Sequence, residues 1–246
     1  MSQSFYFIGG ITGGVGRALA ERLSGSGATV AGYARTAEDL SDLGVAKVFE
    51  ADACDSAAVA GVFKEAQDSF GTPVGYAHCI GSVFLKPLHT MKDEEWTEVI
   101  ATNLTTAFHG LRAAVTAMRR QKTGSVVLVS SVAARFGLPS HEAIAAAKGG
   151  VEGLVRAASA SYANFGIRVN GVAPGLVETS ATKHILGSEQ ARKMSASMHP
   201  LGRIGNPAEV ASLMAWLLSD DASWVSGQVW SIDGGMGGIM PKPRAG

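Results

Sequence analysis

The feature that most constrains the fold of this chain is a cluster of glycines between a short apolar segment and a helix-like segment at its N-terminus. Residues 5–8 are aromatic and apolar, which is typical of a buried strand, and residues 17–27 have the composition of a helix. The glycines between them are Gly9, Gly10, Gly13, Gly14 and Gly16. Glycine lets the backbone approach a pyrophosphate closely, and the free N–H groups of a helix start stabilise its charge. A tight turn without a ligand is the alternative, but the strand–turn–helix context favours a dinucleotide-binding fold.

The rest of the chain alternates strands with helices. We expect further strands at residues 28–33, 45–49, 73–80, 125–129, 167–172 and 228–232. Helices are expected up to Phe70, from a capping box at residues 90–93, around Lys148, and from Pro207 to Leu218. This alternation predicts one α/β domain over residues 1–246, with a doubly wound, parallel, seven-stranded, Rossmann-like sheet. Residues 180–200 are interpreted as a mobile helical lid over the substrate, and residues 236–246 as an irregular tail.

Composition narrows the function classes. The chain has 246 residues and 46% hydrophobic content, enough for one sizeable core, and its 21 basic and 21 acidic residues cancel, so no net field favours nucleic acid. The two cysteines, Cys54 and Cys79, have no metal or disulfide spacing, so we expect no metal and a cytoplasmic protein. The first residues lack a basic segment followed by an apolar one, so we expect no signal peptide, and no apolar run in the sequence approaches the length that spans a membrane. The expected partner is a small molecule rather than nucleic acid or a membrane.

The end of the second expected strand bears on the choice of cofactor. Arg35 and Thr36 follow this strand, and no acidic residue stands at its tip. In dinucleotide folds an acid at this place binds the ribose hydroxyls, whereas an arginine accommodates a 2′-phosphate. The sequence therefore predicts NADP(H) in preference to NAD(H). A solvated surface arginine is the alternative, because exposed arginines are common.

Two later segments carry candidate site residues. The strand at residues 125–129 ends at Ser130 and Ser131, and the Ala-rich helix after it carries Lys148 in a small, apolar setting. A lysine opposite a serine at the carboxyl end of a strand indicates a site. Asn103 stands on an expected helix among apolar neighbours, so its amide needs partners if it is buried.

These residues together resemble the short-chain dehydrogenase/reductase family, of the compact type that includes ketoacyl reductases. The resemblance covers nearly the whole chain and implies an NAD(P)-dependent oxidoreductase. It also implies a homo-oligomer, a tetramer or dimer, paired through the helices of Asn103 and Lys148. The motifs that carry it are Gly10-x-x-x-Gly14-x-Gly16, Asp52, Asn103, Ser131, Lys148, Asn170, Pro174-Gly175 and the segment from Arg203 to Gly235.

The resemblance also implies roles for particular residues. Ser131 would hydrogen-bond the substrate oxygen, Lys148 would hold the nicotinamide ribose, and Asn103 would fix a water in a proton relay. Asp52 and Ala53 would meet the adenine, and Val177 and Thr179 the nicotinamide carboxamide. The implied cofactor-binding set is Gly10, Ile11, Thr12, Gly14, Val15, Gly16, Arg35, Thr36, Asp52, Ala53, Cys79, Ile80, Gly81, Lys148, Pro174, Gly175, Val177 and Thr179.

Three positions depart from the family pattern. Gly9 stands where a threonine usually opens the glycine motif, and His78 stands where Asn-Asn-Ala-Gly usually begins. The third departure is Ile144, which occupies the position of the tyrosine that serves as the proton donor and acceptor. General acid–base catalysis contributes about 10²–10⁴-fold, so we expect ordinary ketone reduction or alcohol oxidation to be strongly impaired.

His141 is a candidate replacement for the missing phenol. Residues 141, 144 and 148 share one helix face, and the interval from His141 to Lys148 equals that from tyrosine to lysine in the related enoyl reductases. Because a helix start disfavours imidazolium, we expect His141 to act as a neutral hydrogen-bond donor. A capping or surface histidine without chemistry is the alternative. Among the other histidines, we expect His78 to pack near the adenosine rather than to be catalytic. His184 and His199 belong to the lid and could touch substrate, but we expect them to lie on the surface.

Two functions therefore stand side by side. The first is an NADP-dependent oxidoreductase with an atypical active site, acting on a small carbonyl, enoyl or imine substrate. The second is a catalytically retired NADP-binding sensor or scaffold subunit. Retention of Ser131, Lys148 and Asn103 favours the enzyme, and Ile144 favours the retired protein.

Overall fold

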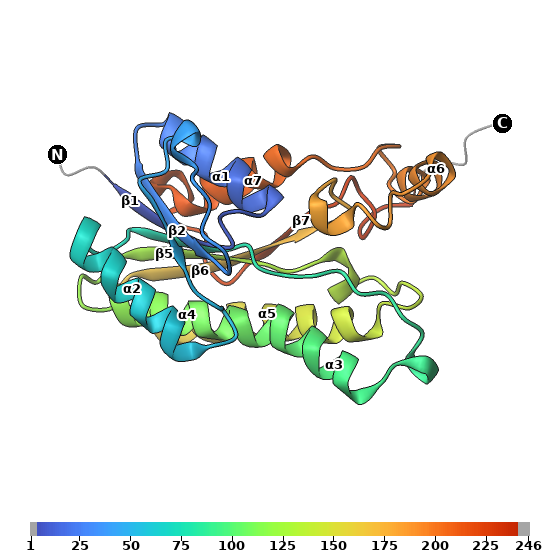
Figure 1. Cartoon of the computed structure of the whole chain (residues 1–246), viewed down its shortest axis with the longest axis horizontal. Helices are drawn as coiled ribbons and strands as arrows, with labels where there is room; N and C mark the ends of the chain where they lie inside the picture. The colour runs from blue at the N-terminus through green and yellow to red at the C-terminus, as the bar shows by residue number, and fades with distance from the viewer. Residues whose placement is uncertain (1–3, 241–246) are drawn as a thin grey trace.

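The computed structural model of the protein describes residues 4–240 and is built on one parallel sheet between two helical layers. Helices α1 and α7 cover one face of the sheet, and α2, α4 and α5 cover the other (Figure 1). The strands are β1 Phe5–Gly9, β2 Thr29–Ala34, β3 Lys47–Glu50, β4 Gly75–His78, β5 Gly124–Val129, β6 Ile167–Pro174 and β7 Val229–Ile232. The α-helices are α1 Gly14–Gly25, α2 Ser56–Phe70, α3 Asp93–Ile100, α4 Thr106–Met118, α5 Glu142–Tyr162, α6 Glu189–Ser197 and α7 Pro207–Leu218.

The strand order is β3-β2-β1-β4-β5-β6-β7, and every pair is parallel, which confirms the predicted doubly wound sheet. The order reverses between β1 and β4, because the chain crosses from β3 at one edge to β4 beside β1. In open parallel sheets the crevice at the carboxyl ends of such strands binds the ligand. The glycine turn after β1 and the segment after β4 both lie at this crevice.

Each face of the sheet buries its own apolar cluster. Along β1, Phe7 packs in the cluster under α2, α4 and α5, whereas Ile8 packs in the cluster under α1 and α7. Strands buried on both faces are almost continuously apolar, which explains why short runs such as residues 126–128 could be recognised. None of the helices within residues 4–240 is long and apolar enough to cross a membrane.

The segment leading into α4 differs from the expected single helix. Thr90 ends a 3-10 turn, Leu88–Thr90, so the expected capping box at residues 90–93 is wrong. Helix α3 begins at Asp93 instead, and the Glu95 carboxylate accepts a hydrogen bond from the backbone N–H of Lys92. A π-helical turn, Ala101–Thr105, then separates α3 from α4. Asn103 lies in this turn.

The expected lid contains two helical pieces. A 3-10 turn spans Ser180–Thr182, and α6 spans Glu189–Ser197 beyond the carboxyl ends of the strands (Figure 1). The tail is described only as far as Met240, where it forms turns, and residues 241–246 lie outside the described residues.

Candidate active site

The glycine turn after β1 leaves room for a ligand. Gly10 has a φ of 78°, and a Cβ there would lie 2.8 Å from Cγ1 of Ile80. A Cβ at Gly16 would lie 2.2 Å from the carbonyl oxygen of Gly10, so both positions require glycine. Gly13 is the N-cap of α1 and provides no side-chain hydrogen bond, which leaves the first N–H groups of the helix for an anion. A dinucleotide phosphate fits this turn.

A cleft of about 210 Å³ runs from the glycine turn to Lys148. It brings together residues of the predicted site from the start of α1, the π-helical turn, α5, and the segments that follow β4, β5 and β6. Of the predicted residues, those that line it are Gly14, Val15, Cys79, Ile80, Gly81, Asn103, Ser131, Lys148, Pro174, Gly175, Val177 and Thr179. Those outside its lining are Gly10, Ile11, Thr12, Gly16, Arg35, Thr36, Asp52, Ala53 and His141. The Ile11 side chain is fully buried in the core under α1 and α7, so only its backbone is left for the turn.

The segments after β2 and β3 surround the expected adenosine end. Arg35 and Thr36 are exposed. Glu38 is the nearest acid after β2, but it is ion-paired with Arg17 of α1, whose Nε also donates to the Thr12 carbonyl. The Asp52 carboxylate accepts from the N–H of Cys54 at 2.9 Å, and the Ala53 carbonyl accepts from Nδ1 of His109 at 3.0 Å.

Lys148 lies at the end of the cleft opposite the glycine turn. Its Nζ donates to the carbonyl oxygen of Val129 at 2.9 Å, and its side chain is buried. Burial lowers the pKa of Lys148 to about 8, with the neighbouring Cys79 opposing this shift. A Cβ on Gly81 would lie 3.3 Å from Nζ, so this glycine keeps the amine accessible from the cleft.

The two serines after β5 have different surroundings. The Ser131 hydroxyl accepts from the Ala133 N–H at 3.2 Å and lines the cleft. Ser130 is buried, and its hydroxyl reaches both the Lys148 carbonyl and the Glu152 carboxylate. Glu152 is buried as well and is paired with Arg135 at 2.8 Å. Ser131 is therefore the serine that a substrate can reach.

Asn103 is fully buried, and its amide has partners on both sides. Oδ1 accepts from the Ser82 N–H at 3.0 Å, and Nδ2 donates to the Ser82 hydroxyl and the Val99 carbonyl, each at 3.1 Å. Both amide protons are thus engaged within the protein, and only a second lone pair of Oδ1 is left for a water. The side chain ties the π-helical turn to the segment after β4.

Ile144 separates the cleft from a second cavity of about 230 Å³. Its side chain is only 4% exposed, and it lines both spaces together with Ser131. The walls of this substrate cavity are mostly apolar. They are formed by Val83, Leu85, Ser131, Val132, Ala133, Leu138, His141, Ile144, Gly175, Leu176, Thr182, Ile185, Ser195, Met198, His199 and Met236.

His141 lines the substrate cavity as the N-cap residue of α5. Its Nδ1 lies 2.8 Å from the carbonyl oxygen of Pro139. Because a carbonyl only accepts, Nδ1 carries the proton, and the neutral ring then has Nε2 as an acceptor. The expectation of a neutral donor is therefore wrong: His141 can accept a proton at Nε2 when neutral and donates from it only as imidazolium.

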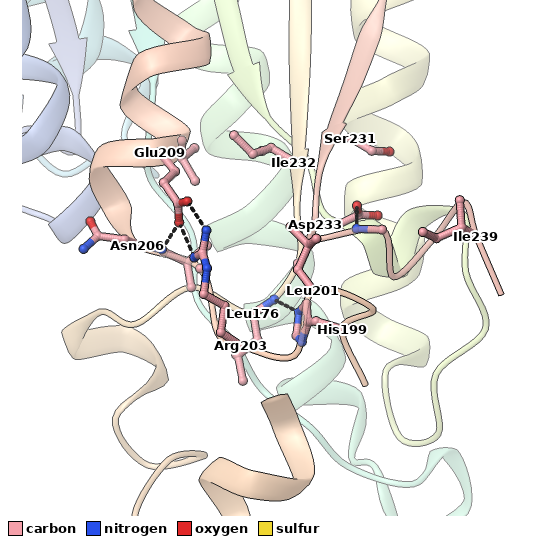
Figure 2. A pocket seen from close by; sticks show the side chains of 16 residues that line it. Leu176, His199, Leu201, Arg203, Asn206, Glu209, Ser231, Ile232, Asp233 and Ile239 are labelled. Atoms are coloured by element: carbon pink, nitrogen blue, oxygen red, sulfur yellow. Dashed lines mark hydrogen bonds and ion pairs between the residues drawn. The ribbon is translucent and has the colours of Figure 1, made fainter. Parts of the chain in front are cut away.

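A third cavity, of about 370 Å³, is enclosed by the segment after β6, the stretch from His199 to the start of α7, and the end of β7 (Figure 2). His199 lines both this rear cavity and the substrate cavity, so its ring forms part of the wall between them. The ring is buried; Nδ1 donates to the Ser195 carbonyl, and Nε2 accepts from the Leu176 N–H at 3.1 Å. The expectation of a surface histidine is wrong for His199, although His184 is exposed. No pattern in the sequence distinguishes the two.

Residues 4–240 contain no group of His, Cys, Asp and Glu that could hold a metal ion. Cys54 and Cys79 are free thiols, and burial raises the pKa of Cys79 to about 12, opposed by the charge of Lys148. What the arrangement offers is a glycine turn for phosphates, a cleft ending at a buried lysine, and a small apolar cavity beside a reachable serine.

Known proteins resemble this chain in both sequence and fold. A family model described as "Enoyl-(Acyl carrier protein) reductase" matches residues 10–237. The chain is 34% identical to 3-oxoacyl-[acyl-carrier-protein] reductase FabG of Salmonella typhimurium over 234 residues, covering 93% of this chain and 95% of the relative. It belongs to the short-chain dehydrogenase/reductase family. The fold superposes on the crystal structure of levodione reductase with a TM-score of 0.90 and 31% identity, covering 96% of this chain and 98% of that one.

Another relative from the same comparison is named as inactive. The chain is 36% identical over 193 residues to a protein named "Inactive 2-(S)-hydroxypropyl-CoM dehydrogenase 2" of Xanthobacter autotrophicus, covering 77% of this chain and 84% of the relative. Membership of the family makes this chain an NAD(P)-dependent oxidoreductase by type, with a nicotinamide cofactor.

Proposed function

We propose that this short-chain dehydrogenase/reductase uses NADP(H) and acts without a tyrosine acid on a small, largely apolar enoyl, imine or carbonyl substrate. The observation that carries the proposal is the position of Ile144, buried between the cofactor cleft and the substrate cavity, beside Ser131. Isoleucine has no proton to transfer, so reactions that depend least on a strong acid are favoured. The bound nicotinamide supplies or takes the hydride.

The remaining residues position the reactants. Ser131 donates a hydrogen bond to the polar end of the substrate, and the Lys148 ammonium holds the nicotinamide ribose. Asn103 fixes the segment after β4 and, through its remaining Oδ1 lone pair, one water. Positioning by itself contributes substantially to a hydride transfer, because the reactants no longer need to find each other in solution. The cavity volume of about 230 Å³ suits a small substrate.

His141 is the proposed proton-transferring group in place of the phenol. Its Nδ1–H is held by Pro139. The preceding loop is fixed as well, because Ser140 has a φ of 62° and its carbonyl accepts from the Lys86 N–H at 3.0 Å. His141 thus exchanges a proton with a substrate atom through Nε2, in the imidazolium form when it donates. A capping histidine without chemistry is the alternative.

A preference for NADP(H) is supported by the charges after β2. Arg35 is exposed and forms no ion pair among residues 4–240, and the nearest acid, Glu38, is neutralised by Arg17. A 2′-phosphate would find a positive side chain without a competing carboxylate.

The second candidate is a catalytically retired protein that binds NADP(H) as a sensor or scaffold. Ile144 and the relative named as inactive both favour it. It differs from the first candidate in one respect only: the cleft would bind cofactor but turn nothing over.

The experiment is a binding assay followed by a substrate screen. We expect NADPH to raise the melting temperature of the wild type; no shift would refute both candidates. Carbonyl, enoyl and imine substrates are then tested on wild type, His141→Ala and Ile144→Tyr. Turnover by the wild type that is lost in His141→Ala supports the first candidate, and full activity of His141→Ala refutes its proton-transfer role. Turnover only in Ile144→Tyr supports the retired protein.

We further propose a homo-oligomer, a tetramer or dimer, formed through α4 and α5. Trp96 and Phe108 are exposed beside this face, and Gly149 and Gly153 on α5 have open space before them. Gly150 is different, because a Cβ there would lie 2.7 Å from Leu104 of the same chain. A monomer in analytical ultracentrifugation would refute this proposal.

We also propose that residues 180–200 act as the substrate lid of a single domain, and that the free thiols suit a reducing, cytoplasmic setting.

A further inference from the structure

Two of the departures from the family pattern, Gly9 and His78, lie next to each other in the sheet. Gly9 of β1 is in register with Tyr33 of β2 on one side and with His78 of β4 on the other. We propose that Gly9 and His78 are parts of one unit: a buried hydrogen-bond chain that positions the floor of the cofactor cleft where the family usually carries threonine and asparagine. The cofactor part of this inference rests on the proposed binding of NADP(H).

The hydrogen-bond chain consists of Tyr33, Tyr76, His78 and Thr106, and its protons can be arranged in only one way. The Thr106 hydroxyl donates to the Thr102 carbonyl at 2.7 Å, so it accepts from Nε2–H of His78 at 3.2 Å. With the proton on Nε2, Nδ1 of His78 accepts from the Tyr76 hydroxyl at 2.9 Å. The Tyr76 oxygen in turn accepts from the Tyr33 hydroxyl at 2.8 Å. Every member is satisfied while the imidazole is neutral.

Burial keeps this arrangement neutral. Tyr33 and Tyr76 are fully buried, and His78 and Thr106 are each 1% exposed. Burial, and to a lesser extent the positive charges of Lys148 and His109, lower the pKa of His78 to about 3. Burial also raises the pKa of both phenols. No side chain of this hydrogen-bond chain is therefore ionised near neutral pH.

The same hydrogen-bond chain explains why glycine is required at positions 9 and 110. A Cβ on Gly9 would lie 2.7 Å from both phenol oxygens, and a Cβ on Gly110 of α4 would lie 2.1 Å from the Tyr76 oxygen. The phenols thus occupy the space that a threonine side chain at position 9 would need. His78 bonds the Tyr76 hydroxyl, and this hydroxyl lies where a side chain at position 9 would be. We therefore treat the two departures as coupled.

The chain holds one end of the segment that forms the cleft floor. His78 directly precedes Cys79, Ile80 and Gly81, all of which line the cleft. The other end of the segment is held at Ser82 by Asn103. Both anchors come from the same short stretch of helix, because Asn103 lies in the π-helical turn and Thr106 follows it. Removing either anchor frees one end of the floor.

The first test compares two matched substitutions of Thr106. Thr106→Val removes the hydroxyl and keeps the shape, whereas Thr106→Ser keeps the hydroxyl. We expect Thr106→Val to weaken NADPH binding about tenfold and Thr106→Ser to leave it within about twofold of wild type. Thr116→Val is the control, because its hydroxyl makes the same bond to the carbonyl four residues earlier but has no histidine partner. Equal binding by Thr106→Val and Thr106→Ser would overturn the positioning role.

The second test needs no cofactor, so it separates failure of this inference from failure of NADP(H) binding. In ¹⁵N spectra His78 should show a protonated Nε2 and an unprotonated Nδ1 from pH 8 to pH 5. Gly9→Ala should lower the melting temperature less in a Tyr33→Phe/Tyr76→Phe background than in wild type, because both colliding oxygens are gone and only the contact with Cζ of the ring at position 33, at 2.9 Å, is left. Titration of His78 near its ordinary pKa, or strictly additive melting-temperature changes, would overturn the coupled unit.

Discussion

The Nζ atom of Lys148 lies 2.9 Å from the carbonyl oxygen of Val129, and within residues 4–240 it forms no ion pair with a carboxylate. The folded protein thus buries a positive charge with one neutral partner. This arrangement disfavours the charged form, which is why the pKa falls to about 8 from its ordinary 10.5. The lysine is retained at a cost in stability, as expected for a group that serves a ligand.

Replacing this lysine should therefore stabilise the protein without ligand. We expect Lys148→Met to raise the free energy of unfolding at pH 7 by about 1–3 kcal/mol and to abolish NADPH binding. Because the folded pKa is depressed, the wild type regains stability as pH rises from about 8 to 10.5, so the advantage of the variant should shrink in that window. Urea unfolding from pH 7 to pH 10.5 measures this. The exposed Lys64→Met is the control, and a variant no more stable than wild type at pH 7 would contradict the prediction.

Restoring the phenol should restore carbonyl chemistry. Ile144 borders both the cleft and the substrate cavity, so a tyrosine there can extend into open space near Ser131 and Lys148. We expect Ile144→Tyr to raise NADPH-dependent ketone reduction about 10²–10⁴-fold over wild type. Ile144→Phe, with the same ring but no hydroxyl, should show no gain. The rate of NADPH oxidation at 340 nm checks both, and equal rates for the two variants would rule out the phenol as the cause.

Arg35 should determine the choice between the two nicotinamide cofactors. A charge-assisted hydrogen bond to a phosphate contributes about 1.5–3 kcal/mol, so Arg35→Ala should weaken NADPH binding about 10–100-fold and leave NADH binding unchanged. Titration of tryptophan fluorescence with each cofactor measures the ratio. Arg22→Ala, an exposed arginine in the last turn of α1, is the control. An equal loss for NADH and NADPH would show that Arg35 acts on the fold rather than on the 2′-phosphate.

The buried histidine of β4 predicts loss of stability in acid. His78 has a folded pKa of about 3 and an ordinary pKa of 6.5, so the unfolded chain takes up a proton between these values while the folded protein does not. Stability should be full above about pH 6.5 and fall toward pH 3 by up to about 1.4 kcal/mol per pH unit from this group. Urea unfolding of wild type and His78→Gln over this range isolates the slope. The exposed His184→Gln should leave the slope intact, and an unchanged slope in His78→Gln would contradict the assignment.

Most of the framework followed from local patterns in the sequence. The strands are short apolar runs buried on both faces, and the glycines after β1 mark positions such as Gly10 and Gly16 where no side chain fits, so each leaves a local signal. The placement of Ser131, Lys148 and Ile144 around one cleft followed from family spacing. The capping box failed because Thr90 is held in a separate 3-10 turn, which lets Glu95 cap the helix at Lys92 instead.

Contacts between distant segments left no local signal. The hydrogen bond between Tyr33 and Tyr76 joins residues of strands that are not neighbours, since β1 lies between β2 and β4, and it forms only once the sheet is assembled. The buried His199 ring accepts a hydrogen bond from the Leu176 N–H, which lies 23 residues away in the sequence. The tautomer of His141 depends on the direction of the Pro139 carbonyl, a property of loop geometry that residue types do not encode.

The π-helical turn at Ala101–Thr105 makes the length of this stretch as important as its composition. A π turn accommodates an additional residue within an otherwise α-helical path. Each residue of an α-helix is rotated by about 100° from the one before it. Deleting one residue of the turn would let α3 and α4 form one continuous helix. It would also rotate Asn103 relative to α4 and turn its side chain away from Ser82. The cleft floor would lose an anchor although every remaining side chain was kept. The position of Asn103 thus depends on the number of residues in this turn as well as on their identity. A deletion here would disturb the site even where no substitution would.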